Sequence, residues 1–570
     1  MRLLRINDTD IDIDDQTAIG VDLQSYDIKS LGDTFVKVTN TFTVPATINN
    51  LVVFGLPNNP QSLSTKVYDE SVCNYWVGND HIVDNGKVSV QEIQDRISLF
   101  VYEKPSIWDI LKTVYFSDIL PDLITWLGAN KGLYTGPGTH FVGTFLAFIN
   151  QFINPTEGVI LPMAWSNLRE RKITVGAGGL VEIERFITTQ YNIYLRNKYV
   201  DTFENSKVID SYGGHFCIYV KTIFEFIEDT YGVNFLTGGG VLPGNIWDDP
   251  IAKRMYTDVK EVAINVTFSG LYDIYFFAAQ TQPTTANNFE PYVEIKDKAD
   301  KSLYDFVLSF MQHFNIIKDE FIIEGEKVIR LARFDDLETI GSVKDFSGLA
   351  GIPKYKPFVD GYAQNNYIKF KEVYDTGDSN INSKVLALNN KNIDKVKTLF
   401  EIDAHVPAVI KQGVDSILDL SKKEAFKTFT FMVSNGLCSY DTFVTYYIAG
   451  VVTGAGVAVR LQKAQLYSLD SEYNFLAGAL VYPKWYEVQK WLTPPQVKNF
   501  EFFKLYYFRE LNGSFFINKI KGYNPELSNE SVTLEILRMS DRTPVTPPDL
   551  DYWVDGVDDS WFDGVFDYWY

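Results

Sequence analysis

Two hydrophobic patterns follow each other along this chain, and together they predict a β-rich protein that also contains helices. In residues 8–14, Thr9, Ile11 and Ile13 alternate with aspartates, a period typical of a half-buried strand. Residues 34–45 and 87–103 are strand-like as well. We therefore expect strands to dominate the first hundred residues.

Helical spacing of apolar residues marks three later segments. It covers residues 106–128, where we expect Pro121 to interrupt the helix, and recurs in residues 219–235 and 301–316. Ser302 followed by Asp305 predicts a helix N-cap. The last two segments each place their apolar residues on one face, which indicates core packing: Ile223, Phe226, Ile227 and Tyr231; Leu303, Phe306, Val307, Phe310, Met311 and Phe314.

Turn residues predict hairpins in the second half of the chain. Glu324-Gly325 can reverse the chain within residues 321–334, and Asn512-Gly513 predicts a type I′ turn within residues 501–523. Residues 532–539 predict a last strand. The uncharged stretch 442–459 reaches about the minimum length for a membrane span, but its Gly and Thr content favours two strands that reverse at residues 454–456.

A second apolar stretch, residues 139–153, is too short to cross a membrane. We expect a helix packed inside the subunit, and keep contact with a membrane or with a neighbouring subunit as the alternative. A stable membrane span is therefore not expected anywhere in the chain.

Length and composition indicate a multidomain protein with large contact surfaces. A chain of 570 residues is too long for one core, and it carries 41 Phe, 34 Tyr and 10 Trp, residues that favour strands and interfaces. We expect an α+β, β-rich fold with β-barrel or tube-like domains, helical insertions and an extended C-terminal tail. The predicted division is an N-terminal β domain (1–105), a helical apolar insertion (106–165), a β-rich domain with one helix (166–298), a helix-hairpin unit (299–350), a β-rich hub domain (351–540) and a Pro-rich spacer with a docking tail (541–570).

The charge and the scarcity of chemical motifs argue against an enzyme. A net charge of −21 disfavours a protein that grips phosphates, although it suits a wall past which DNA must slide. Three cysteines and five histidines are scattered, and no HExxH, CxxC, GxSxG or P-loop pattern occurs. The aspartates of residues 8–14 lack the Gly and the final Glu of an EF-hand, so calcium is a minor alternative. We predict no catalytic residue, cofactor or metal ligand.

The last residues are at once aromatic and acidic. Trp553, Trp561 and Trp569 recur every eight residues, and residues 549–570 contain seven Asp but no Lys or Arg. A Pro-rich spacer separates them from the last predicted strand. We predict that these three tryptophans, with Tyr552 and Tyr568, are interface anchors to a neighbouring subunit or tail protein.

A series of segments resembles tail proteins of phages and prophages of Bacteroides and its relatives. The first match is residues 37–55, with the pattern T-x-T-x-P-x-T-x-N-N followed by Phe54 and Gly55. Further matches follow in the same order along the chain: 302–315 and its hairpin, 345–348, 363–372, 398–404, 506–525 and 532–539. The shared order makes the chain similar to tail hub or tube-like proteins of such phages, including the crAss-like group, and similar in plan to baseplate hub proteins.

This resemblance implies a structural subunit of the virion tail, a hub or ring and adaptor protein, rather than an enzyme. It implies a ring-forming homo-oligomer whose partners are other tail or portal-ring proteins, with genomic DNA passing through the lumen at ejection without specific binding. Two other functions remain open at this point. One is a receptor- or glycan-binding tail protein, because exposed Trp and Tyr can stack on sugars; the other is a cell-wall or polysaccharide hydrolase.

Overall fold

The computed structural model describes six longer stretches of the chain and short strands between them. The stretches are residues 2–131, 155–160, 217–258, 301–373, 383–437 and 462–540. Short gaps inside them are 15–16, 18, 25, 30–37, 40, 70, 79, 104–105, 241, 324–325, 340–342, 358–359, 407, 413–414, 420–428, 494–495, 498–499 and 525–530.

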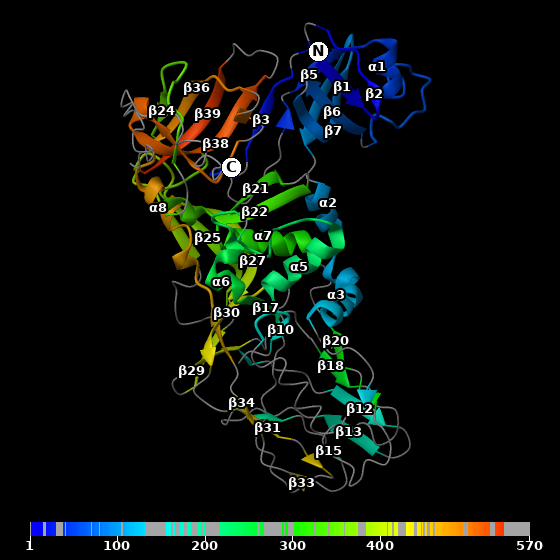
Figure 1. Cartoon of the computed structure of the whole chain (residues 1–570), viewed down its shortest axis with the longest axis vertical. Coiled ribbons are helices and arrows are strands. Elements are labelled where there is room, and N and C mark those ends of the chain that lie inside the picture. The colour runs from blue at the N-terminus through cyan, green and yellow to red at the C-terminus, as the bar shows by residue number, and fades with distance from the viewer. Residues whose placement is uncertain are drawn as a thin grey trace, which may run out of the picture.

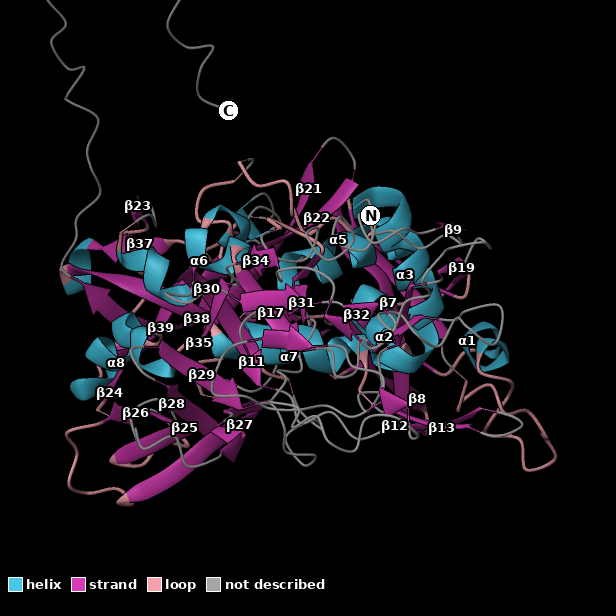
Figure 2. Ribbon diagram, turned by 90° about the horizontal axis from the view of Figure 1, so that it is seen from below, coloured by secondary structure: helices cyan, strands magenta, loops and turns pink. Residues whose placement is uncertain are grey.

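The predicted α+β, β-rich fold class is confirmed. Figure 1 shows an N-terminal group of strands and a C-terminal group beside each other at one end of the long axis, helices in the centre, and short strands towards the other end. Figure 2 shows strands, in magenta, on several sides of the molecule, with helices, in cyan, among them.

A large sheet joins the two ends of the chain. Its strands run in the order β2-β1-β6-β7-β8-β4-β3-β38-β39-β36-β24. In addition, β5 pairs with β8, β37 pairs with β38, and β23 pairs with β37. The N-terminal members are β1 (Arg2–Ile6), β2 (Thr9–Asp10), β3 (Val21–Leu23), β4 (Val38–Thr39), β5 (Phe42–Pro45), β6 (Ser71–Val77), β7 (Asp80–Ile93) and β8 (Arg96–Glu103). The later members are β23 (Val343–Asp345), β24 (Lys354–Lys356), β36 (Trp485–Lys490), β37 (Leu505–Phe508), β38 (Gly513–Tyr523) and β39 (Val532–Ser540).

The T-x-T-x-P-x-T-x-N-N motif forms strand β5 and the short helix α1 (Ile48–Val53). Thr47 caps the helix by accepting the N–H of Asn50. Asn50 is fully buried, and its amide donates to the carbonyls of Asp12 and Pro45 at 2.9 and 2.8 Å. At Gly55, φ is +77° and a Cβ atom would lie 1.9 Å from Ser64 Oγ, so only glycine fits there. The motif residues are thus structural ones.

The strand predicted over residues 8–14 is shorter than expected. It comprises only Thr9–Asp10, because Asn7 and Asp8 adopt positive φ angles of 47° and 63° and turn the chain back onto β1. Ile11 still donates its N–H to the Leu4 carbonyl at 2.8 Å, and after it side-chain contacts replace strand pairing. Asn50 accepts the N–H of Asp12, and Arg96 contacts Asp14 at 2.6 Å. Asp12 and Asp14, which are part of the alternating pattern in the sequence, therefore make contacts with the side chains of Asn50 and Arg96 and not with a neighbouring strand.

The predicted closing hairpin is present, but its turn differs from the expected type I′ turn. Phe508 pairs with Gly513, which leaves four residues in the loop. Arg509–Leu511 form a 3₁₀ turn (η5) that ends at Asn512 in the left-handed conformation, with φ of 44°. Arg538 contacts this turn: its Nη2 donates to the Asn512 carbonyl at 3.1 Å, and its Nε lies 2.9 Å from where a Cβ of Gly513 would be. The last predicted strand, β39, is confirmed.

The centre of the molecule is an aromatic core around two of the predicted helices. Helices α5 (Val220–Tyr231) and α7 (Leu303–His313) are confirmed, and α7 begins at a capping box made by Ser302 and Asp305. Trp247 stacks on Phe310 with ring centroids 5.6 Å apart. Such pairs add about 0.5–1.5 kcal/mol each beyond burial. The other central elements are η1 (Ile246–Asp248), α6 (Pro250–Lys253), β21 (Ile316–Ile323), β22 (Glu326–Arg333), η2 (Phe334–Glu338), η4 (Leu469–Ser471) and α8 (Asn474–Val481).

Hairpin β21–β22 is confirmed by its pairing, which closes at Ile323 and Glu326; its predicted turn residues lie outside the described part. The helical segment after residue 105 is also confirmed, but its break is not at Pro121. Helix α2 (Ser106–Thr113) ends before Tyr115, and α3 (Phe116–Lys131) continues through Pro121. The break lies at residues 114–116 because their backbone bonds to residues 301–303 instead.

Smaller sheets complete the described part of the chain. A five-stranded sheet contains β10 (Val159–Ile160), β16 (Cys217–Tyr219), β17 (Met255–Asp258), β30 (Phe431–Leu437) and β35 (Gln462–Leu466). A three-stranded sheet contains β26 (Ser383–Ala387), β25 (Asn365–Val373) and β27 (Val396–Val406). The remaining strands are β9 (Gly138–Thr139), β11 (Ala164–Trp165), β12 (Arg171–Val175), β13 (Gly179–Ile183), β14 (Asn192–Tyr194), β15 (Lys198–Tyr199), β18 (Ala263–Val266), β19 (Asn288–Phe289), β20 (Pro291–Glu294), β28 (Ala408–Gln412), β29 (Asp415–Asp419), β31 (Thr442–Thr445), β32 (Tyr447–Ile448), β33 (Val451–Val452) and β34 (Val457–Val459).

Of the two apolar stretches, residues 442–459 contain strands, as predicted. Strand β31 pairs with β34, and β32 pairs with β33 inside them, so the chain reverses between Ile448 and Val451. The predicted turn at residues 454–456 lies outside the described residues. The predicted helix of residues 139–153 lies outside the described residues except for Thr139. No helix among the described residues is long and apolar enough to cross a membrane.

Candidate functional site

The five predicted anchors, Trp553, Trp561, Trp569, Tyr552 and Tyr568, lie outside the described residues. Within the described part, no group of three or more His, Cys, Asp and Glu side chains could hold a metal ion, and this includes the aspartates of residues 8–14. The polar clusters that the structure does describe join segments that are distant in sequence. Two of them position the main parts of the molecule.

The first cluster holds the connecting segment, residues 21–29, of which all but residue 25 are described. This segment leads from the N-terminal strands into the C-terminal group, and β3 within it pairs with β38 and with β4. The Ile28 N–H donates to Asn518 Oδ1 at 2.7 Å, and the Tyr362 hydroxyl donates to the Ile28 carbonyl at 2.6 Å. Tyr26 donates to Asn315. Pairing with β38 and the Ile28–Asn518 bond thus fasten the start of the chain to its end, while Tyr362 and Asn315 hold the same segment on the middle of the chain.

A charged pair completes this first cluster. Lys29 lies 2.9 Å from Glu535, which is 2% exposed, and Lys521 also bonds to Glu535. Burial alone would raise the pKa of Glu535, but the hydrogen bonds from Lys521 and Lys29 outweigh it and lower the pKa. Lys29 also lies 5.1 Å above the Trp485 ring. Glu535 therefore stays ionised and holds the connecting segment on β39.

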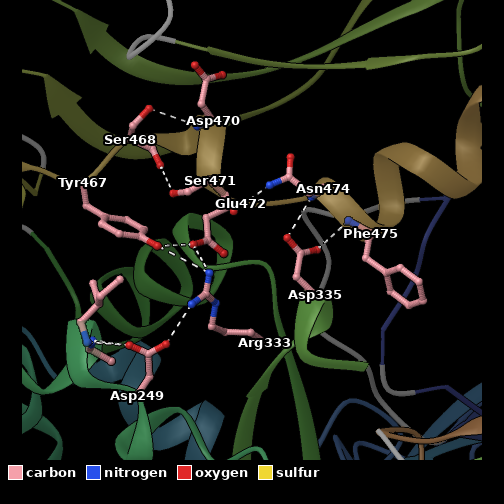
Figure 3. A network of polar contacts seen from close by, with 12 residues as sticks. Asp249, Arg333, Asp335, Tyr467, Ser468, Asp470, Ser471, Glu472, Asn474 and Phe475 are labelled. Atoms are coloured by element: carbon pink, nitrogen blue, oxygen red, sulfur yellow. Dashed lines mark hydrogen bonds and ion pairs between the residues drawn. The ribbon is translucent and has the colours of Figure 1, made fainter. Parts of the chain in front are cut away.

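The second cluster is the Arg333 network, which Figure 3 shows where three chain segments meet: one at Asp249, one at residues 333–335 and one at residues 467–475. Arg333, at the end of β22, donates to Glu472 Oε1 at 2.5 Å and to Asp249 Oδ2 at 2.9 Å. The Tyr467 hydroxyl donates to the same Glu472 oxygen at 2.6 Å. Asp249 also caps α6, so one guanidinium ties that helix to the segment before α8.

Asp335 extends the Arg333 network to α8. The residue before this helix, Tyr473, has a φ of 62° and supplies no side-chain cap. Asp335 instead accepts the N–H groups of Asn474 and Phe475 at 2.9 and 3.2 Å (Figure 3). A carboxylate at a helix N-terminus also interacts favourably with the helix dipole. Helix α8 is therefore capped by a residue about 140 positions away.

The electrostatics of the Arg333 network follow from its burial. The Glu472 side chain is fully buried, and this burial raises its pKa to about 7, although Arg333 and Tyr467 act in the opposite direction. Burial alone would lower the pKa of Arg333, but Glu472, Tyr467 and Asp249 raise it. Burial also raises the pKa of Asp335. Every one of these groups is held by a partner from another segment, an arrangement that fixes geometry.

A buried histidine lies against this network. His313 is 1% exposed, and its ring centroid lies 5.3 Å from that of Phe431 and 5.7 Å from that of Tyr467. Burial lowers the pKa of His313 to about 3. The imidazole is therefore neutral in the folded chain at neutral pH, whereas an unfolded chain protonates it below about pH 6.5.

We expect His313 to make the centre of the molecule sensitive to acid. Its folded-state pKa is depressed, so its contribution is fully present above pH 6.5 and is lost as the pH falls towards 3. Between pH 6.5 and 5, this one residue lowers the free energy of unfolding by about 2 kcal/mol. In the His313→Phe variant this part of the pH dependence should vanish, as measured by hydrogen exchange of α7 at both pH values. An equal pH dependence in both proteins would contradict the assignment.

Sequence reasoning missed Arg333, Glu472 and Asp335, and it missed the connecting segment. A local signal existed for Asp249. It directly precedes Pro250, and an aspartate followed by proline is a typical start of a helix, with the aspartate as N-cap and the proline at the first helical position. Neither Arg333 nor Glu472 occurs in a pattern that distinguishes it from the other charged residues of the chain. Their pairing arises from contacts between residues 139 positions apart.

Comparison with known proteins gives little beyond this geometry. No family model matches the chain, and no curated protein matches it. Among solved structures, the chain is similar to the 43 kDa tail protein of prophage MuSo2 from Shewanella oneidensis. The two share 7% sequence identity, the alignment covers 94% of this chain and 97% of that chain, and the TM-score is 0.31. At these values the similarity carries no inference about the fold or the function of this chain.

Proposed function

We propose that this chain is a structural subunit of a bacteriophage tail, a hub or ring and adaptor protein located in the virion. In this role it forms a closed homo-oligomer, contacts other tail or portal-ring proteins and surrounds the path of the genomic DNA. The observation that carries the proposal is the ordered series of sequence segments that resembles phage tail proteins.

The structural roles of these segments support the proposal. Asn50 of the first segment is fully buried and bonds to Pro45 and Asp12. Asn366 of the segment 363–372 is also fully buried, and its amide donates to the Ala363 and Leu386 carbonyls. Phe346 of the segment 345–348 lies in the central core. These residues thus stabilise the fold and carry no chemistry of their own, as expected in a structural protein.

Charge and composition are compatible with a conduit for DNA. A net charge of −21 would repel the phosphate backbone and limit its friction with the wall. Rings of this kind often bury more than about 2,000 Å² per interface, which the 85 aromatic residues of the chain could supply. The C-terminal anchors would add a contact to a neighbouring subunit.

The oligomeric state of the purified chain tests the proposal. Sedimentation velocity and particle imaging should show a closed ring with cyclic symmetry, formed by the chain alone or on addition of a neighbouring tail protein. A chain that stays monomeric with every tail protein from the same genome would refute the proposed ring.

A further inference from the structure

One margin of the three-stranded sheet β26-β25-β27 is basic in an otherwise acidic protein. Residues 389–397 contain three lysines against one aspartate, whereas the whole chain has a net charge of −21. We call Lys391, Lys395, Lys397, Val396 and Tyr482 the lysine margin. Within the described residues, Lys391 and Lys395 have no carboxylate partner, and both are exposed. Figure 2 shows β25 and β27 at one side of the molecule.

The lysine margin also carries apolar side chains that water contacts. Val396 is 61% exposed and Tyr482 is 67% exposed. Ala387, Asn365 and Val396 lie in one row across the three strands, so the margin spans about 10 Å there. Asn389 joins Tyr482 to this row, because its side chain donates to the Tyr482 hydroxyl at 2.6 Å and its N–H donates to the Val481 carbonyl at 2.9 Å.

The C-terminal end of the last strand lies near the same margin. In the antiparallel pair β36–β39, Trp485 lies opposite Leu537. Tyr482 precedes Trp485 by three residues and Ser540 follows Leu537 by three, so both extend from the same end of the pair. The Arg538 N–H donates to the Lys484 carbonyl at 3.1 Å, beyond the regular pairing. The chain therefore leaves β39 close to Tyr482.

The segment that follows complements the lysine margin in charge and in polarity. Residues 541–548 contain three prolines, and eight extended residues can span about 25 Å. Residues 549–570 then supply seven aspartates and three tryptophans without any basic residue. A tethered segment meets a nearby surface at an effective concentration of about millimolar, so even weak contacts suffice to hold it.

We propose that the lysine margin binds residues 549–570 of the same chain before assembly. The aspartates pair with Lys391, Lys395 and Lys397, and the aromatic rings cover Val396 and Tyr482. This contact shields three tryptophans that would otherwise promote premature association. This contact forms within the isolated chain and does not depend on the proposed tail function. If residues 549–570 of one copy bound the lysine margin of another copy instead, the same contacts would join neighbouring subunits in the assembled tail.

Zero-length cross-linking of the full chain tests this proposal. A carbodiimide joins a carboxylate to an amine only where the two are in contact. In an equal mixture of unlabelled and ¹⁵N-labelled chains at low concentration, we expect amide links from aspartates of residues 549–570 to Lys391, Lys395 or Lys397, within one copy. Links that reach exposed Lys66 and Lys253 equally often would overturn the proposal, as would links mainly between labelled and unlabelled copies.

A charge-reversal variant provides a second test without cross-linking. In Lys391→Glu/Lys395→Glu, amide exchange of residues 549–570 should accelerate at least about fivefold relative to the unmodified chain. Lys66→Glu/Lys253→Glu is the matched control, because it changes the net charge equally at exposed positions elsewhere, and it should leave this exchange unchanged. Equal exchange in all three proteins would refute the proposal.

Discussion

Replacing Glu472 with alanine is expected to destabilise the centre of the molecule by about 3 to 5 kcal/mol. The variant leaves Arg333 buried without its shortest ionic contact, and it removes the acceptor of the Tyr467 hydroxyl. Asp249, at 2.9 Å from Arg333, compensates only one side of the guanidinium. Loss of Glu472 should also loosen the segment that leads into α8. The residue that caps α8, Asp335, lies only two positions after Arg333.

Local exchange is the appropriate measurement of this effect. In the described part of the chain, the buried apolar side chains form two separate clusters, one confined to residues 4–101, so a single cooperative unfolding transition is not expected. Urea-dependent hydrogen exchange of η2 and α8, measured at pH 8 where Glu472 is ionised, reports the relevant opening directly. Both elements should open together at lower urea in the variant.

A double variant and an exposed pair provide the controls. Arg333→Met combined with Glu472→Leu removes both charges and should recover part of the loss, because breaking a buried pair costs more than replacing it. Glu501→Ala removes a carboxylate that is 37% exposed and 2.8 Å from Lys504, and should cost no more than about 1 kcal/mol. A loss for Glu472→Ala as small as that for Glu501→Ala would contradict the structural role of the network.

Removing the three tryptophans of the C-terminal segment is expected to abolish assembly while leaving the folded body intact. The last described strand, β39, ends at Ser540, before the spacer. An anchor residue at an interface contributes about 2 kcal/mol, so each lost tryptophan lowers affinity roughly thirtyfold. Trp553→Ala/Trp561→Ala/Trp569→Ala should therefore be missing from particles, and infectivity should fall accordingly.

The comparison is made on particles produced with each variant in place of the natural chain. Val545→Ala/Ser560→Ala, which changes the same region but keeps all the rings, is the matched control and should assemble normally. Deletion of residues 549–570 should reproduce the triple tryptophan variant. Normal assembly and infectivity after that deletion would show that the segment is not an anchor.

The features predicted correctly from the sequence depend on neighbours along the chain. The capping box joins Ser302 and Asp305, which are three positions apart, and the apolar residues of α7 recur every three or four positions. The hairpin at residues 505–523 was predicted from a local turn, and even there the turn type was wrong because Phe508 pairs with Gly513. Local propensity therefore identifies an element more reliably than its exact geometry.

The features missed from the sequence depend on segments that meet only in the folded chain. Pairing of β3 with β38 joins residues about 500 positions apart, and the cap of α8 comes from Asp335 rather than from a residue next to the helix. The break between α2 and α3 was misplaced because backbone contacts to residues 301–303, not Pro121, determine it. No periodicity within one segment carries this information.

A reconstruction of the virion encoded by the same genome tests the central claim most directly. The account predicts that this chain occupies the tail as a closed ring around the DNA path, with residues 549–570 contacting a neighbouring subunit or tail protein. If purified, infectious particles lack the chain, or contain it outside the tail, the claim that it is a tail subunit is contradicted.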